Sequence, residues 1–354
     1  MLYHTKNPHG GDTYGTEITL DFSVNLNPFG TPPSVIETIK AVSNQVENYP
    51  DTYCRGLIAA IAAYEAAGVR QEQIFCGAGA AELIYRFCGT LRPKRAAAAA
   101  PTFSEYGSAA AFFGAEVVRH LLTAENDFAI DRSILRFLEE QKPDVLFLCT
   151  PNNPTGQTVP RALLKDILAL CSTQGTRVLL DECFLDFTEA ESATDLLELY
   201  PNLLILKAFT KNFALAGVRI GYCLTADESL LERMAAAGQP WDVSTLAQAA
   251  GIAAARERGW VTRAKACISK ERGVLTEGLR ALGFYVCPSE ANFLLFRAPV
   301  GLDAALRREK IAIRSCAMDA GLGEGWYRTA VRLPEENRKL LAAIRNVMED
   351  RTWH

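Results

Sequence analysis

Short apolar runs alternate with amphipathic stretches along most of this chain. Helical patterns fill most of the segments between apolar runs of strand length, which occupy residues 74–76, 96–100, 117–121, 145–149, 178–180 and 203–206. Strands that alternate with helices are typical of crossover units, which build parallel sheets. The pattern therefore predicts an α/β protein with a mostly parallel sheet that is flanked by helices.

The apolar run at 96–100 has the length of a strand but consists of residues that favour a helix. Residues 96–100 are five consecutive alanines, and alanine has the highest intrinsic helix propensity. The run is nevertheless short, fully apolar and bounded by Pro93 and Pro101. We therefore predict a strand rather than a helix at this position.

The two ends of the chain differ from the central pattern. Residues 1–33 are rich in Gly, Pro, Asn and Thr, with one strand-like patch, and such a segment must pack on the rest of the chain to be ordered. After a break near residue 240, a helical pattern over 245–282 leads into short strands and helices. We predict an N-terminal arm that packs with the small domain (1–33), a large domain (34–240) and a small C-terminal α/β domain (241–354).

The segment 203–224 carries polar residues between two apolar runs. Thr210, Lys211 and Arg219 lie between the runs, so we expect two buried strands that flank a polar turn. A lysine in apolar surroundings has a lowered pKa, because desolvation penalises the ammonium form, and a neutral amine can condense with an aldehyde. Arginine and threonine side chains are suited to a phosphate. Two surface cations in a loop are the commoner alternative, and the segment alone leaves both open.

Composition excludes several classes of partner. The 354 residues are 49% hydrophobic and 22% charged, as in ordinary globular proteins, and the net charge is −4 with no basic block. Nucleic acid and anionic membrane are therefore poor partners, and no run reaches membrane-spanning length. The ten cysteines contain no CxxC spacing, which argues against a metal site. We interpret them as reduced thiols of a cytoplasmic protein.

The loop at residues 76–82, Cys-Gly-Ala-Gly-Ala-Ala-Glu, connects a predicted strand to a predicted helix. Glycines allow an anion to approach the backbone, and the first amides of the helix supply donors. The third glycine of a dinucleotide signature is absent, and no acidic residue at a strand end follows about twenty residues later. A phosphate cradle and a tight turn without a ligand both remain open for this loop alone.

Polar side chains follow two other predicted strands. Asn153 belongs to the Pro-Asn-Asn-Pro-Thr-Gly run at 151–156, and Asp181 follows the strand at 178–180. Open α/β sheets bind ligands at the carboxyl ends of their strands. A buried carboxylate without a partner is costly, so we expect Asp181 to pair with a cation, for which a protonated pyridine nitrogen is one candidate.

These motifs together are the parts of a pyridoxal phosphate site, and with them the chain resembles a known family. It is similar to the fold-type I pyridoxal-phosphate enzymes in the histidinol-phosphate aminotransferase branch, and most closely to the L-threonine-O-3-phosphate decarboxylases of cobalamin biosynthesis. The resemblance extends from His-Gly-Gly at 9–11 and Asp-Phe-Ser-Val-Asn-Leu-Asn-Pro at 21–28 to Trp-Tyr-Arg-Thr-Ala-Val-Arg at 326–332. It implies that the large domain binds the cofactor.

The resemblance also implies roles for individual residues in holding the cofactor. Lys211 would form the covalent link, and Asp181 would keep the pyridine nitrogen protonated. The other contacts would come from the backbone amides of Ala80 and Ala81 and from the side chains of Phe103, Asn153, Thr210 and Arg219. Tyr49 would reach the phosphate in the partner subunit, so the resemblance implies a homodimer.

A second group of residues would bind the substrate. Arg328 would hold the substrate carboxylate, and Asn153 would also contact the substrate. A substrate phosphate would lie near His9, Gly10, Asn27, Arg314 and Arg332. Two positions depart from the aminotransferase pattern. Ala208 lacks the hydroxyl that many relatives have there, which removes one hydrogen bond to the cofactor phosphate, worth about 1 kcal/mol. Phe184 replaces a tyrosine, and phenylalanine is usual in the decarboxylase.

The resemblance therefore predicts decarboxylation of L-threonine O-3-phosphate, or a close phosphorylated amino acid, to (R)-1-amino-2-propanol O-2-phosphate. The alternative is an aminotransferase that acts on histidinol phosphate or an aromatic amino acid. A non-catalytic regulator is disfavoured because the chain has no basic DNA-binding segment. A nucleotide-binding oxidoreductase is disfavoured by the incomplete glycine pattern.

Overall fold

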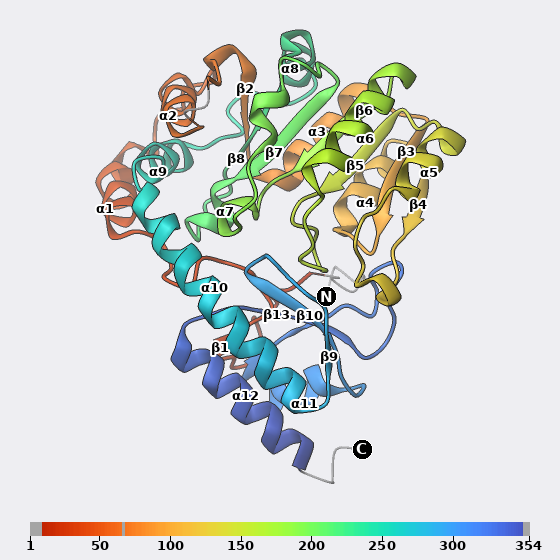
Figure 1. The fold of residues 1–354 in the computed structure, drawn as a ribbon. Helices are drawn as coiled ribbons and strands as arrows, with labels where there is room; N and C mark the ends of the chain where they lie inside the picture. The colour runs from red at the N-terminus through yellow and green to blue at the C-terminus, as the bar shows by residue number, and fades with distance from the viewer. Residues whose placement is uncertain (1–8, 66–67, 350–354) are drawn as a thin grey trace.

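The computed structural model describes residues 9–65 and 68–349 (Figure 1). The first residues of the predicted N-terminal arm, 1–8, and the last residues of the predicted small domain, 350–354, lie outside the described residues. None of the helices in the described ranges combines the length and hydropathy that crossing a membrane requires.

The larger of the sheets has seven strands in the order β2-β8-β7-β6-β5-β3-β4. Their bounds are β2 Ile74–Gly77, β3 Arg95–Ala100, β4 Glu116–Leu121, β5 Val145–Cys149, β6 Arg177–Asp181, β7 Leu203–Ala208 and β8 Gly221–Leu224. Neighbours from β4 to β7 pair in parallel, whereas β8 is antiparallel to both β7 and β2. The prediction of a mostly parallel sheet is confirmed.

Helices cover both faces of this sheet, as Figure 1 shows. Alternate residues of a strand point to opposite faces, and because the strand residues here are apolar on both faces, each face needs a covering layer. Leu179 and Phe147 belong to the core that α3 (Ala80–Leu91), α4 (Ser104–Phe112) and α8 (Glu228–Ala236) share. Leu180 and Leu148 belong to the opposite core. The helices of that core are α1 (Pro33–Val42), α2 (Arg55–Glu65), α5 (Ser133–Gln141), α6 (Arg161–Gln174) and α9 (Thr245–Ala254).

The alanine run forms strand β3, as predicted. Ala96 and Ala98 are buried in one core and Ala97 and Ala99 in the other, while β4 and β5 flank the strand on its two edges. Burial on both faces and pairing on both edges satisfy the backbone of this segment as a strand. Tertiary context therefore overrides the helix propensity of alanine here.

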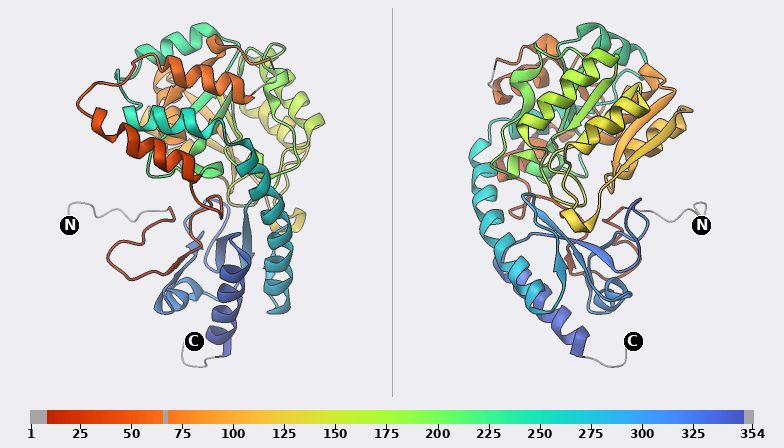
Figure 2. Two further views of the ribbon diagram at one scale, coloured as in Figure 1. Left: turned by 90° about the vertical axis from the view of Figure 1, so that its left-hand side faces the viewer. Right: turned by 45° about the vertical axis from the view of Figure 1, so that its right-hand side comes forward.

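The C-terminal part contains a smaller antiparallel sheet in the order β12-β13-β10-β9. Its elements are α10 (Arg258–Ala281), β9 (Tyr285–Val286), β10 (Phe293–Arg297), α11 (Leu302–Arg308), β12 (Arg314–Ser315), β13 (Trp326–Ala330) and α12 (Pro334–Glu349). Figure 2 shows α10 extending from the large sheet to this part, alongside α12. The N-terminal segment joins it through β1 (Leu20–Asp21), which pairs in parallel with β11 (Ile311–Ala312).

The structure differs from the predicted elements in three places. The expected polar turn after β7 contains a short helix, α7 (Phe209–Asn212), and β8 begins only at Gly221. The long helix expected over 245–282 is interrupted at 255–257, where α9 ends in a tight turn in which Arg256 N donates to the Ala253 carbonyl and Glu257 N to the Ala254 carbonyl. The strand expected over 311–314 divides between two sheets.

Helix α9 packs against α1 and α2, on the side of the large sheet. Residues 245–254 therefore do not lie with the C-terminal sheet, although the predicted boundary assigns them to the small domain. Short 3-10 helices complete the described elements: η1 Ser43–Gln45, η2 Gln71–Gln73, η3 Ala124–Asn126, η4 Leu185–Phe187 and η5 Ala193–Leu196.

Candidate active site

A cavity of about 390 Å³ lies where the ends of β5, β6 and β7 meet the N-terminal segment and the C-terminal sheet. Of the residues predicted from the sequence, it is lined by His9, Gly10, Ala80, Ala81, Phe103, Asn153, Asp181, Thr210, Lys211, Arg219, Arg314 and Arg328. These residues come from widely separated parts of the chain. The fold thus brings most of the predicted site residues around one space.

Lys211 lies in α7, directly after the buried strand β7. Burial, followed by the charges of Arg328 and Arg219, lowers the pKa of Lys211 to about 8. Its Nζ lies 5.6 Å from the ring centre of Phe184. A larger fraction of this amine is therefore neutral near pH 7 than for an ordinary lysine, and the neutral amine is the form that attacks a carbonyl group.

Asp181 ends β6 and is buried in the cavity wall. Its Oδ1 accepts from the backbone N of Cys183 at 2.9 Å, and its Oδ2 accepts from the hydroxyl of Tyr106 at 2.6 Å. Burial raises the pKa of Asp181. A cation at this place would favour the carboxylate form, as a protonated pyridine nitrogen does.

Tyr106 is not among the predicted site residues, although it lies three positions after Phe103 in the run Pro-Thr-Phe-Ser-Glu-Tyr at 101–106. It is fully buried in α4, and its ring stacks on Phe147 with centres 5.3 Å apart. Its hydroxyl fixes the orientation of the Asp181 carboxylate. The sequence contains no local signal for this contact, because 75 positions separate the two residues.

The loop before α3 forms an anion cradle. The helix begins at Ala80 after Gly79, whose φ of 95° is one that other residues rarely adopt. A Cβ atom on Gly79 would lie 2.8 Å from the Arg219 guanidinium, and one on Gly221 would lie 3.0 Å from Ala80 N. The absence of side chains here allows Arg219 and the first amides of α3 to surround one point, which fits a phosphate group.

Two neighbouring positions modify this cradle. Arg219 itself adopts a φ of 62°, in the left-handed region, where strain in a residue other than glycine is often found at functional sites. Thr210 lines the cavity with its hydroxyl-bearing side chain, whereas Ala208 is buried at the end of β7 and contributes no hydroxyl. The donor set therefore fits pyridoxal phosphate, and Ala208 adds no donor to it.

Arg328 lies at the centre of the opposite wall, in β13. Its Nη1 donates to Asn153 Oδ1 at 2.5 Å and its Nη2 donates to the Ser23 carbonyl at 2.7 Å. Burial, and then the charge of Arg314, lower the pKa of Arg328 to about 9. Because these hydrogen-bond partners are neutral, this buried guanidinium is suited to bind a carboxylate of a ligand.

The N-terminal segment covers the same end of the cavity. His9 Nε2 lies 2.9 Å from Glu105 Oε1, and this contact lowers the pKa of Glu105. A Cβ atom on Gly10 would lie 2.1 Å from the Ser23 carbonyl oxygen, so only glycine allows the segment to lie this close. On the other side, Arg314 donates to Asp319 at 2.8 Å. Histidine and arginine thus face the space beside Arg328.

Three predicted residues do not line the cavity. Asn27 donates to the Asn212 carbonyl at 2.8 Å, and Arg332 bonds Glu336 and the Asp21 carbonyl. Tyr49 is 78% exposed, with its ring 4.6 Å from that of Trp241. The geometry therefore offers no support for substrate contacts by Asn27 and Arg332.

Asn25 occupies the place that was expected for Asn27. It is buried and lines the cavity, and its amide, with the oxygen turned toward Arg328, accepts from Nε and Nη1 at 3.2 Å. The motif contains asparagine at both positions, two residues apart, and the sequence alone did not show which one faces the site. Phe184 also lines the cavity, against Phe293 at 5.1 Å, so the side chain at this position brings no hydroxyl.

The described residues contain no group of histidine, cysteine and carboxylate side chains arranged to hold a metal ion. Asp181, Lys211 and the cradle are instead placed to hold an organic cofactor that carries a phosphate.

The chain matches the family model described as aminotransferase class I and II over residues 17–344. It is 36% identical to the threonine-phosphate decarboxylase of Salmonella typhimurium over 334 residues, covering 93% of this chain and 91% of that protein. It is 31% identical to the histidinol-phosphate aminotransferase of Methanothermobacter thermautotrophicus over 350 residues, covering 96% and 92%. Among solved structures, the histidinol-phosphate aminotransferase from Clostridium acetobutylicum matches with a TM-score of 0.85 and 29% identity, covering 93% and 98%.

Proposed function

Because this chain belongs to the aminotransferase class I and II family, we propose that it decarboxylates a phosphorylated amino acid, L-threonine O-3-phosphate, in cobalamin biosynthesis. The chain is an enzyme with the fold-type I aminotransferase-like fold, and its cofactor is pyridoxal phosphate. One observation carries the proposed substrate: besides the cofactor cradle, the cavity is lined by two further arginines, Arg314 and Arg328, and by the imidazole of His9. An amino acid with both a carboxylate and a phosphate matches this set.

Pyridoxal phosphate supplies an electron-withdrawing ring that accepts the electron pair left on Cα when a bond to it breaks. Asp181, held by Tyr106 and the Cys183 amide, would keep a proton on the ring nitrogen. Asn153, with its Oδ1 engaged by Arg328, would offer its Nδ2 to the phenolic oxygen. Arg219 and the amides of α3 would anchor the phosphate.

Lys211 would hold the cofactor and then move protons. With the substrate amine bound in its place, the free amine of Lys211 would face Cα. With a pKa of about 8, set by burial and nearby arginines, it can donate a proton near neutral pH. In decarboxylation this proton would replace the departing CO2 on Cα.

The reaction outcome depends on which bond at Cα stands perpendicular to the ring. Arg328, fixed by Asn153 and Ser23, would hold the carboxylate, while His9 and Arg314 would hold the phosphate. Binding the substrate at both ends sets the rotation about Cα. We propose that this arrangement places the Cα–carboxylate bond perpendicular to the ring.

A test separates decarboxylation from aminotransfer. The holoenzyme is incubated with L-threonine O-3-phosphate and no keto acid, with serine O-phosphate in parallel. The proposal requires sustained CO2 release. A single half-turnover to pyridoxamine phosphate, repeated only after a keto acid is added, would contradict it. One methyl group contributes only about 1 kcal/mol in a pocket, so both phosphorylated substrates are worth measuring.

Aminotransfer to or from histidinol phosphate is the second candidate function, and relatives named as histidinol-phosphate aminotransferases favour it. Both functions need a phosphate site and a cofactor lysine. Phe184 favours decarboxylation over aminotransfer, because the aminotransferases that this chain resembles usually have a tyrosine at the corresponding position. The same incubation, with histidinol phosphate and a keto acid as substrates, decides between the two.

We also propose a homodimer in which Tyr49 reaches the cofactor phosphate of the partner subunit. The exposure of Tyr49, together with the exposed Val46, Tyr53 and Trp241 around it, supports this proposal. Mixing inactive Lys211→Ala protein with Tyr49→Ala protein should restore activity, because a mixed dimer contains one site with both native residues. If the mixture is no more active than the separate variants, the shared site is contradicted.

We also propose a cytoplasmic location, which the ten free cysteines support.

A further inference from the structure

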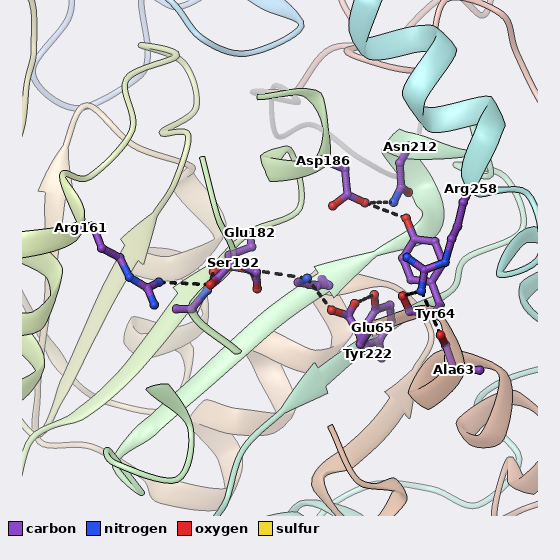
Figure 3. A network of polar contacts seen from close by, with 12 residues as sticks. Ala63, Tyr64, Glu65, Arg161, Glu182, Asp186, Ser192, Asn212, Tyr222 and Arg258 are labelled. Atoms are coloured by element: carbon purple, nitrogen blue, oxygen red, sulfur yellow. Dashed lines mark hydrogen bonds and ion pairs between the residues drawn. The ribbon is translucent and has the colours of Figure 1, made fainter. Parts of the chain in front are cut away.

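A hydrogen-bonded cluster lies behind α7, and the proposed reaction does not use it. Asp186, in η4, accepts at Oδ2 from the Tyr64 hydroxyl at 3.0 Å and from Asn212 Nδ2 at 2.7 Å. Figure 3 shows Asp186 beside both side chains. Asn212 directly follows Lys211, and Tyr64 lies near the end of α2. None of the three residues of this cluster lines the cavity.

The cluster supports a helix that is too short to be stable alone. Helix α7 has four residues, and a single turn is unstable unless other parts of the protein hold it. The buried ring of Tyr64 packs edge-on against Phe209, at 5.9 Å, and against Phe213, at 6.0 Å, which lie on either side of Lys211 in the chain. Tyr64 thus contacts α7 with its ring and reaches Asp186 with its hydroxyl.

Asp186 also links the two segments that carry Phe184 and Lys211, both of which line the cavity. It follows Phe184 by two positions in the chain and bonds Asn212, the residue after Lys211. The ring centre of Phe184 lies 5.6 Å from Lys211 Nζ. Asn27 completes the support, because its backbone N donates to the Lys211 carbonyl at 2.9 Å and its Nδ2 donates to the Asn212 carbonyl. The backbone around Lys211 is therefore fixed from two directions.

We propose that Asp186, oriented by Tyr64, is a positioning residue that holds α7 so that Lys211 faces the cofactor. This inference rests on the proposed role of Lys211 and is independent of which bond at Cα breaks. Weakening the cluster should let the Lys211 amine move away from Arg219 and Arg328 and toward water. Asp181 and Cys183 also face this amine and stay unchanged in the variants below.

The same region offers a matched control. Tyr222, in β8, is also fully buried, and its hydroxyl donates to Glu65, which pairs with Lys207 of β7 at 2.8 Å. Figure 3 shows this second group beside the first. The ring of Tyr222 lies 5.4 Å from that of Phe209 in α7, and Tyr222→Phe keeps this ring. The variant therefore removes a hydroxyl from a buried bond to a carboxylate without breaking a bond to Asp186.

The experiment compares Tyr64→Phe, Asp186→Ala, Asp186→Asn and Tyr222→Phe as holoenzymes. We expect Tyr64→Phe and Asp186→Ala to raise the midpoint of the pH-dependent change in cofactor absorbance by about half a pH unit, because separation from cations and hydration both favour the protonated form of the Lys211 nitrogen that would carry the cofactor. They should lower kcat more than they change KM. Asp186→Asn keeps an acceptor oxygen and should stay near the wild type. Tyr222→Phe should lose thermal stability without a shift in the midpoint.

The cofactor-free proteins give an independent readout. The pH dependence of Lys211 acetylation, measured by mass spectrometry, should shift upward in Tyr64→Phe and not in Tyr222→Phe. Equal midpoints in the wild type and Tyr64→Phe, or an equal shift in Tyr222→Phe, would overturn the inference. A cofactor absorbance that survives Lys211→Ala would instead contradict the proposed role of Lys211, while the acetylation result still tests the positioning of its helix.

Discussion

The cofactor side and the substrate side of the cavity are built in different ways. The cofactor side consists of strand ends and one helix start within a single sheet, where Asp181 and Lys211 follow neighbouring strands. On the substrate side, His9 comes from the beginning of the chain and Arg328 from near its end, and the Ser23 carbonyl links the two segments. The first side depends on one continuous core, and the second depends on how separate segments dock. We therefore propose that the first side holds the cofactor and that the second side selects the reaction.

The largest expected effect comes from the cofactor side. Lys211→Ala should abolish the visible absorbance of the bound cofactor and lower activity by about a thousandfold or more, because no other amine lines the cavity at this position. Absorbance spectra before and after borohydride treatment check the first part. Retained activity would place the reacting amine elsewhere and remove the distinction between the two sides.

Arg328→Lys should have the next largest effect. A lysine cannot donate to Asn153 and Ser23 while also binding a carboxylate in a bidentate manner. We expect kcat/KM to fall about a hundredfold, equally for phosphorylated and unphosphorylated amino acids, with the cofactor spectrum preserved. A lost spectrum would show that the two sides are not separable.

The pH dependence of cofactor binding tests the cofactor side alone. Lys211 has a pKa of about 8, and only its neutral form attacks the aldehyde. The rate of cofactor binding to the cofactor-free protein should therefore rise with pH and level off above about 8. A rate that still increases steeply at pH 9.5 would show that Lys211 titrates as an ordinary lysine.

His9→Ala should have a smaller and selective effect. We expect about a tenfold loss of kcat/KM for phosphorylated substrates, which corresponds to one charge-assisted hydrogen bond, and little change for unphosphorylated ones. Glu105→Gln is the matched control, because it removes the negative partner of His9 and leaves the imidazole in place. An equal loss for both kinds of substrate in His9→Ala would exclude the N-terminal segment from phosphate recognition.

The smallest expected effect is a gain on the cofactor side. Ala208→Ser should add a hydroxyl close to the cradle and tighten cofactor binding by about 1 kcal/mol, or about fivefold. Equilibrium titration of the cofactor-free protein measures this change, and Ala208→Cys serves as a control of similar size with a weak donor. Weaker binding in Ala208→Ser would show that the buried site at the end of β7 has no room for the hydroxyl.

Several parts of the fold and the candidate site were accessible from the sequence because their signals are local. Alternating apolar runs predicted the parallel sheet, and prolines around five alanines identified β3 despite their helix propensity. For the glycine loop before α3, the sequence left an anion cradle and a tight turn without a ligand open, and the close approach of Gly79 to Arg219 favours the cradle. For Lys211, the sequence left a desolvated amine and a surface cation open, and the lowered pKa of about 8 agrees with the first.

Other parts depended on contacts between residues far apart in the chain. Asn25 rather than Asn27 faces the cavity, Tyr106 orients Asp181, and Asp186 joins α2 to α7. Neither periodicity nor a short motif encodes which distant partner a buried polar group will meet. Such partners follow from the packing of whole elements, since buried donors and acceptors must be satisfied wherever the folded chain places them.

The sequence by itself thus determined the class of fold, because strand periodicity is a property of short segments. Its motifs around the glycine loop, Asp181 and Lys211 indicated the cofactor only in combination, through the resemblance that they carry. Only the tertiary structure decided which side chains share the cavity with Lys211 and which support it from behind. The physical reason is that Arg328, Asn153 and Ser23 meet through the docking of the N-terminal and C-terminal segments on the large sheet. That docking depends on the surfaces of complete domains, which no single stretch of sequence contains.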